Sequence, residues 1–117
     1  MPVSLFVALL LFAAMGGALL WHPQYLTRLT NLELTTIESR NEVRAVYGGF
    51  GVAIAIALYI AAVYSPLRAG IMVTTGLALI GMAAGRGYSG WLERPSTLVW
   101  GFCALEALLG LAVFFQI

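Results

Sequence analysis

Four long runs of apolar residues dominate the sequence, and short polar stretches separate them. Each run has close to the roughly 20 residues that a helix needs to cross the hydrocarbon core of a bilayer. The runs cover residues 3–21, 45–64, 67–86 and 96–115. This pattern predicts an all-α fold, an integral membrane four-helix bundle, in which residues 1–117 form a single domain.

Residues between the runs carry helix-boundary signals. Ser65-Pro66 provides an N-cap residue and a first-turn proline, which predicts a tight antiparallel hairpin between the second and third helices. Pro95-Ser96 gives a similar signal before the fourth helix. Residues 87–94 are therefore predicted to form a short polar turn.

The segment 22–41 is the only sizeable stretch outside the predicted spans. Leucine and isoleucine residues alternate with polar ones there, which predicts a partly helical segment lying at the bilayer surface. The pairs Thr35/Glu38 and Ser39/Glu42 both match the capping-box pattern. We expect one of them to begin the second helix.

Composition supports a lipid environment. The chain has 117 residues, of which 62% are hydrophobic and only 9% are charged. A soluble domain carries about 25% charged residues, so this chain has too little polar surface to cover a water-soluble globule. A net charge of +1 gives no electrostatic case for binding nucleic acid. Cys103 is the only cysteine and His22 the only histidine, and no metal site is expected.

Alternation of the helices predicts the topology. Both termini and the turn at 65–66 fall on one side, and the segments 22–41 and 87–95 fall on the other. The first side holds only Arg68, whereas the second holds five arginines. The positive-inside rule places the second side in the cytoplasm. Those five residues are Arg28, Arg40, Arg44, Arg86 and Arg94.

Polar residues gather where the second helix begins. At 100° per residue, Asn41, Arg44 and Tyr47 share one helix face with a stripe of small residues. This predicts that Arg44 points into the bundle, although an interfacial arginine that extends to the headgroups is the alternative. Glu42 points roughly the opposite way, which suits a capping role. The small residues are Gly48, Gly51, Ala55 and Ala62.

Arg86 ends the third predicted helix, at the same depth as Arg44. It follows Gly81 and Gly85, which match the GxxxG pattern of membrane helix contacts. Arg86 is either a cytoplasmic-side anchor or part of a polar cluster with Arg44.

Glu106 is the only charged residue in the fourth helix. It lies about ten residues from the helix start, or about 15 Å deep at 1.5 Å per residue. A charge near the bilayer midplane costs at least ~2.5–3.5 kcal/mol, so such a residue is a functional candidate. It is a neutral acid bonded across helices, a site that binds or protonates a ligand, or a subunit contact. A direct pair with Arg86 or Arg44 is expected to be marginal without a bridging water or Tyr47.

The run Asn41-Glu42-Val43-Arg44-Ala45-Val46-Tyr47-Gly48-Gly49 resembles the signature of a family of small four-helix bacterial membrane proteins, known as a domain of unknown function. The ending Gly85-Arg86 is similar too, and the layout looks like the broader DoxX-like membrane proteins. The resemblance implies a bacterial membrane protein, and together with the positive-inside rule this predicts the inner membrane with both termini periplasmic. It also implies that Asn41, Glu42, Arg44, Tyr47 and Arg86 belong together.

Three functions are compatible with these residues. The first is a non-catalytic binding or accessory subunit whose polar cluster receives a lipidic ligand or partner. The second is an intramembrane enzyme or redox accessory acting on a quinone- or lipid-like substrate, with Glu106 as proton donor or acceptor. The third is an oligomeric proton-coupled carrier that uses Glu106. No cofactor is indicated, and a homo-oligomer or a larger membrane complex is compatible with each.

Overall fold

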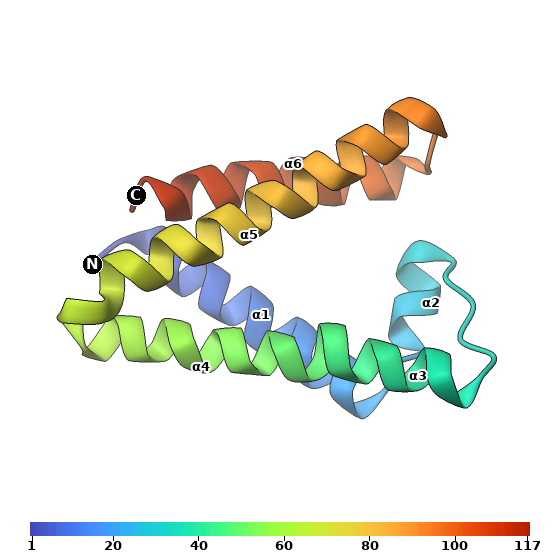
Figure 1. Cartoon of the computed structure of the whole chain (residues 1–117), viewed down its shortest axis with the longest axis horizontal. Coiled ribbons are helices and arrows are strands. Elements are labelled where there is room, and N and C mark those ends of the chain that lie inside the picture. Colours follow the sequence, from blue (N-terminus) through green and yellow to red (C-terminus); the bar gives the residue numbers. More distant parts are fainter.

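Four helical stretches are long and apolar enough to cross a bilayer, as the hydropathy pattern predicts. The computed structural model describes residues 1–117, and the all-helical class is confirmed (Figure 1). α3, η1 and α4 follow one another without a break and form one long helix. In chain order the elements are α1 (Val3–Trp21), α2 (Tyr25–Thr30), α3 (Ile37–Val43), η1 (Arg44–Gly49), α4 (Phe50–Val63), α5 (Ser65–Leu92) and α6 (Thr97–Phe114).

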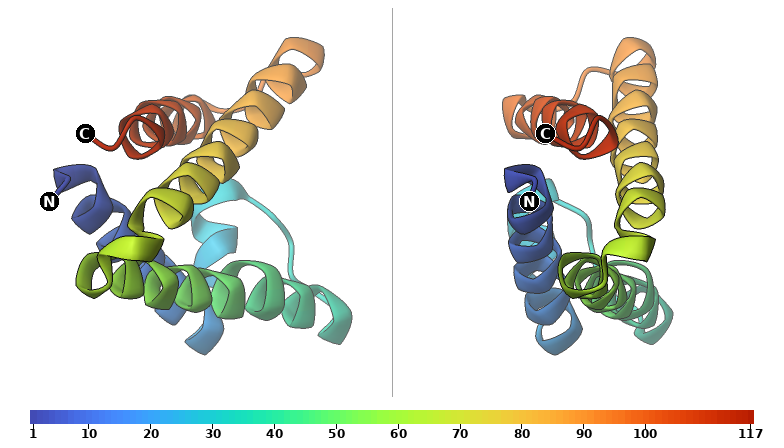
Figure 2. Two further views of the ribbon diagram at one scale, coloured as in Figure 1. Left: turned by 60° about the vertical axis from the view of Figure 1, so that its left-hand side comes forward. Right: turned by 90° about the vertical axis from the view of Figure 1, so that its left-hand side faces the viewer.

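The long helices form two antiparallel pairs, α1 with η1 and α4, and α5 with α6 (Figures 1 and 2). Glycines bring the backbones together in both pairs. A Cβ added to Gly16 of α1 would lie 2.5 Å from the backbone nitrogen of Val52. A Cβ added to Gly76 of α5 would lie 2.6 Å from the backbone nitrogen of Phe114. Such close approach is typical of helices that pack inside membranes.

The two pairs meet at the end of the molecule that holds both chain termini. The hydroxyl of Ser4 donates to the carbonyl of Ala112 at 3.3 Å, which joins α1 to α6. The α4–α5 turn lies at the same end (Figure 1). One hydrophobic core takes side chains from all four long helices, among them Leu5, Phe12, Leu58, Met72, Leu79, Leu109 and Val113.

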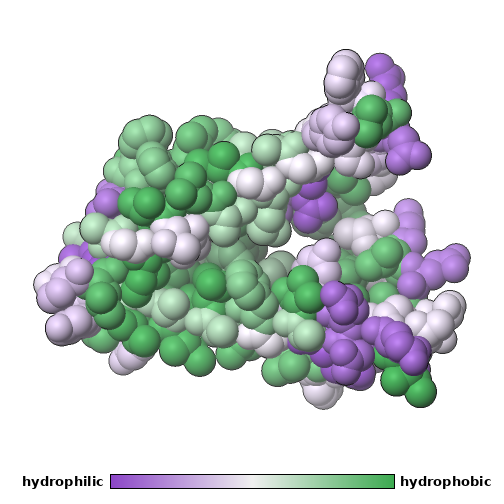
Figure 3. Space-filling view, in the orientation of Figure 1, coloured by the Kyte–Doolittle hydropathy of each residue, from purple (hydrophilic) through white to green (hydrophobic).

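At the opposite end the two pairs diverge. α5 leans away from α3, and a notch with hydrophilic surface around it separates the two arms in Figure 3, although α2 keeps contact with α6. A second, smaller core at this end takes its side chains from α1, α2, the linker after α2, and α3. It consists of Leu19, Leu26, Leu34 and Val43.

α5 is longer than predicted. The helix continues to Leu92, so the predicted polar turn at 87–94 is wrong over most of its length. Tertiary packing explains the difference, because the ring of Trp100 lies against the backbone of Gly90, 2.5 Å from where a Cβ would stand. A side chain at position 90 would block that contact, so the glycine serves packing and does not end the helix.

The segment 22–41 is partly helical, as predicted. α2 is followed by extended chain, and α3 begins with a capping box in which Thr36 and Ser39 exchange hydrogen bonds of 3.0 and 3.2 Å. Both capping boxes predicted from the sequence are therefore wrong. Ser65 is also the first residue of α5 and not its N-cap, although Pro66 lies in the first turn as predicted.

A π-helix at η1 changes the helical phase. Its hydrogen bonds join residues five apart in place of four, so side chains before it are rotated relative to an ideal α-helix. Val43 and Gly48, five residues apart, are both buried, whereas Arg44 is exposed. The small residues after this point pack closely against another helix as predicted, and that helix is α1, since a Cβ on Gly51 would lie 2.9 Å from the Cα of Gly16.

Candidate functional site

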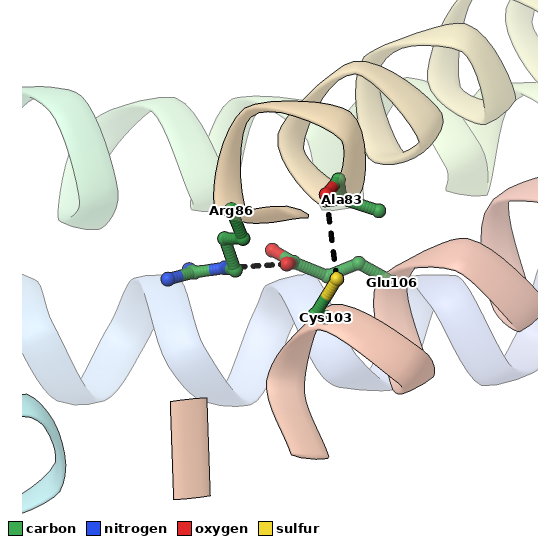
Figure 4. A network of polar contacts seen from close by, with 4 residues as sticks. All are labelled: Ala83, Arg86, Cys103 and Glu106. Atoms are coloured by element: carbon green, nitrogen blue, oxygen red, sulfur yellow. Dashed lines mark hydrogen bonds and ion pairs between the residues drawn. The ribbon is translucent and has the colours of Figure 1, made fainter. Parts of the chain in front are cut away.

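The main polar feature of the long helices is an ion pair between α5 and α6. The Nε of Arg86 donates to the Oε1 of Glu106 at 2.5 Å (Figure 4). Glu106 is buried, with 7% of its surface exposed, and the Arg86 side chain is 29% exposed. The pair therefore satisfies a carboxylate that would be costly to bury alone.

The direct contact corrects the expectation that a direct pair between Arg86 and Glu106 would be marginal. α5 runs six residues beyond Arg86, or about 9 Å at 1.5 Å per residue, so Arg86 does not lie at the helix end. Helical side chains lean toward the N-terminus of their helix, which carries the guanidinium further along α5 toward Glu106. No bridging water or Tyr47 is needed.

Neighbouring residues of α6 fix the arginine in place. The Cζ of Arg86 lies 5.8 Å from the ring centroid of Phe102, one turn before Glu106. On the same helix, the Sγ of Cys103 donates to the carbonyl of Ala83 at 3.3 Å. Sequence reasoning missed Phe102, although its i,i+4 spacing from Glu106 was the available signal.

The guanidinium of Arg86 has N–H donors that no residue of the chain accepts from. Only its Nε donates within the chain, and Figure 4 shows the terminal nitrogens of Arg86 pointing away from Glu106. The two Nη atoms carry four N–H donors in a planar fork that matches oxygen acceptors. Arg86 is thus positioned by α6 and presents its outer edge to a neighbouring space.

An apolar groove of about 500 Å³ lies between α5 and the first helix pair. On α5 it is lined by Ala78 and Met82, and Arg86 follows Met82 by one turn on the same helix face. Arg86 does not itself line the groove but lies one turn beyond its last residue on α5. The lining residues are Phe12, Met15, Ala45, Val46, Tyr47, Phe50, Ala78 and Met82.

Tyr47 and Val46 connect the groove to a second cavity. Both residues line the groove and this cavity of about 300 Å³ near the start of the long helix. Glu33 and Glu42 also line the second cavity. The apolar groove is thus continued by a cavity whose lining includes two acidic residues.

The structure does not bring all the predicted site residues together. Asn41, Glu42 and Arg44 are exposed on α3 and η1, and the one ion pair of the chain joins Arg86 to Glu106. The predicted inward direction of Arg44 is wrong, because the π-helix gives its place on the packed face to Val43. No group of three or more His, Cys, Asp or Glu side chains is arranged to hold a metal ion.

Together these features define a class: small all-helical proteins with four apolar helices of bilayer length and a buried charged pair between the last two. This chain belongs to the family described as a domain of unknown function, DUF4345, whose model matches residues 1–116. Membership of a small uncharacterised family agrees with the prediction from the sequence. The specific N-E-x-R signature and the DoxX-like relation stay predictions. No match was found among curated proteins or solved structures.

Proposed function

We propose that this protein is a multi-pass membrane protein of non-catalytic character, a binding or accessory subunit that receives a lipidic molecule. The apolar part of that molecule occupies the groove between α5 and the first helix pair. Its polar part meets the free edge of Arg86. The observation that carries this proposal is an apolar groove whose lining on α5 ends at Met82, one turn before an arginine with unpaired terminal nitrogens.

Exposed hydrophobic side chains support insertion into a bilayer. Every long helix has a large apolar residue that is more than half exposed, and a surface of this kind requires a non-aqueous surrounding. These include Leu10 of α1, Ile56 of α4, Leu77 of α5 and Leu108 of α6, which are 67%, 57%, 55% and 70% exposed.

The distribution of arginines supports an orientation in a bacterial inner membrane, with the diverging end cytoplasmic and both termini periplasmic. Arg68, the one arginine at the termini end, donates to the carbonyls of Ala61 and Ala62 at 2.8 and 3.2 Å. It thereby caps the last turn of α4. The remaining five arginines all belong to the other half of the molecule, as the positive-inside rule requires of the cytoplasmic side.

Glu106 favours binding over the two alternatives. Its carboxylate accepts from Arg86 and only 7% of the residue is exposed, so a direct proton transfer to a quinone- or lipid-like substrate lacks an approach. It is also buried between α5 and α6 and does not lie on an outer face, where an oligomeric carrier or a subunit contact would place it.

Filling the groove tests the proposal. Ala78→Trp places a large side chain in the groove, and Leu77→Trp is the matched control, because Leu77 is exposed on α5 but does not line the groove. Each protein is purified in mild detergent, and co-purified lipidic molecules are quantified by mass spectrometry. We expect Ala78→Trp to lower the retained amount by about tenfold, which corresponds to ~1.4 kcal/mol of lost binding.

The control is expected to retain as much as the wild type. Equal retention by all three proteins would show that the groove does not hold the molecule and would reject the proposed function.

A further inference from the structure

We infer that the polar group received at Arg86 is an uncharged hydrogen-bond acceptor of the carbonyl class, as in an ester, a ketone or a quinone, and not an anion. This inference rests on the proposed function and adds the chemistry of the ligand to it. It follows from the balance of charge around the groove.

The arginine one turn beyond the groove is already neutralised. Its positive charge is paired at 2.5 Å with the carboxylate of Glu106, so the two residues together carry no net charge. An anion bound to the outer edge of Arg86 would leave one uncompensated negative charge among apolar helices, which is unfavourable. A neutral acceptor uses the same donors and leaves the balance unchanged.

The neighbouring cavity also disfavours an anionic ligand. Glu33 and Glu42 line the space beyond Tyr47, and their carboxylates repel an anionic headgroup that extends out of the groove. Arg40 and Arg44 belong to the same long helix, but neither lines the cavity that Glu33 and Glu42 line. Arg40 donates instead to the carbonyl of Leu34 at 3.2 Å.

The available donors suit a carbonyl oxygen. Such an oxygen has two lone pairs and no proton to give, and the Nη groups of Arg86 are donors only. The phenol of Tyr47 lines the groove and provides a further donor along its length. A ligand with a hydrocarbon chain and one or two carbonyl groups is complementary to this sequence of apolar and donor surfaces.

Probes with one shared chain test the inference on the whole protein. Binding is measured in dodecyl maltoside, which contains no carbonyl group, with hexadecane, methyl palmitate, hexadecyl benzoquinone and hexadecyl phosphate. We expect the carbonyl probes to bind about tenfold more tightly than hexadecane, because unpaired buried donors are costly. The phosphate, an anion at neutral pH, is expected to bind no better than hexadecane. Comparing methyl palmitate with hexadecyl benzoquinone shows whether the site prefers an ester or a quinone carbonyl.

Glu106→Gln changes the predicted selectivity. Glutamine keeps an acceptor for the Nε of Arg86 but removes the negative charge, so the pair gains a net positive charge. We expect hexadecyl phosphate to become the tightest probe, with a gain of about tenfold or more, since charge-assisted hydrogen bonds are the stronger ones. The double variant Arg86→Gln/Glu106→Gln restores neutrality and is expected to prefer methyl palmitate again. A purely structural role for Glu106 would weaken all probes alike.

The outcomes separate this inference from the proposed function. Tighter binding of the phosphate to the wild type would overturn the carbonyl assignment, while the groove stays a lipid site. If no probe binds, or if Ala78→Trp leaves every affinity unchanged, the proposed function itself fails. The wild-type series alone decides the inference if the variants do not fold.

Discussion

The two helix pairs use different chemistry at the end where they diverge. In the first pair, a Cβ on Gly48 would lie 2.8 Å from the Cα of Leu20, so the two helices pack through direct backbone contact. In the second pair, the ion pair of Arg86 and Glu106 connects the helices. The first pair shows that this protein can pack two helices here without buried charge. A buried ion pair is weak evidence for stability, so the charged pair needs a reason beyond packing.

Removing the acid is the strongest way to break the second pair. Glu106→Ala leaves the guanidinium of Arg86 without its partner between two apolar helices. We expect the free energy of unfolding to fall by about 3 kcal/mol or more, seen as a lower Tm in detergent. Arg86→Leu/Glu106→Leu is the control, because removing both charges is often neutral. Equal losses in the single and double variants would mean that the side chains matter for volume and not for charge.

Adding a side chain at the backbone contact of the first pair is expected to lower the free energy of unfolding by a smaller amount. Gly16→Leu drives a side chain into the backbone of α4, where a Cβ would already lie 2.7 Å from the carbonyl carbon of Gly51. We expect a loss of about 1–3 kcal/mol from overpacking, measured by the same thermal unfolding. Gly17→Leu is the control, since a Cβ there meets nothing within 4 Å. Destabilisation by Gly17→Leu of the same size would contradict the backbone contact.

The smallest effect is expected at the start of α3, which extends the first pair into its arm. Thr36→Ala removes the side-chain oxygen that accepts from the backbone N–H of Ser39 at 3.0 Å. We expect a loss of about 1 kcal/mol, confined to α3 and visible as faster hydrogen exchange of its amides. Thr35→Ala, one residue earlier and outside the capping box, is expected to leave exchange unchanged. Faster exchange in both variants would argue against the observed cap.

The four apolar helices were predictable because each is a long apolar run that the hydropathy of the sequence reports directly. Glu106 and Arg86 were also identifiable, since a charge in an apolar helix is conspicuous whatever it contacts. Their pairing was not predictable, because it depends on where α5 ends. Three glycines between Gly85 and Gly90 indicated a helix end, and only the contact of Trp100 with Gly90 shows why the helix continues.

The groove lay beyond sequence reasoning for a different reason. Its lining comes from α1, η1, α4 and α5, and no local pattern reveals which faces of separate helices come together. The π-helix was equally hidden, because Arg44 to Gly49 carries no composition that distinguishes π from α geometry. The helix faces predicted at 100° per residue therefore agree with the burial of Gly51 and Ala55 but not with the exposure of Arg44.

The wide turn at η1 lets the long helix hold one residue more than regular α geometry allows while Val43 stays buried. A regular α-helix over the same residues would put Arg44, four residues before Gly48, on that face. Deleting one residue between Val46 and Gly49 would restore ordinary spacing and keep Val43 in register with the residues that follow the turn. A homologue shorter by one codon at this place would thus present the same face of α3 without a π-helix.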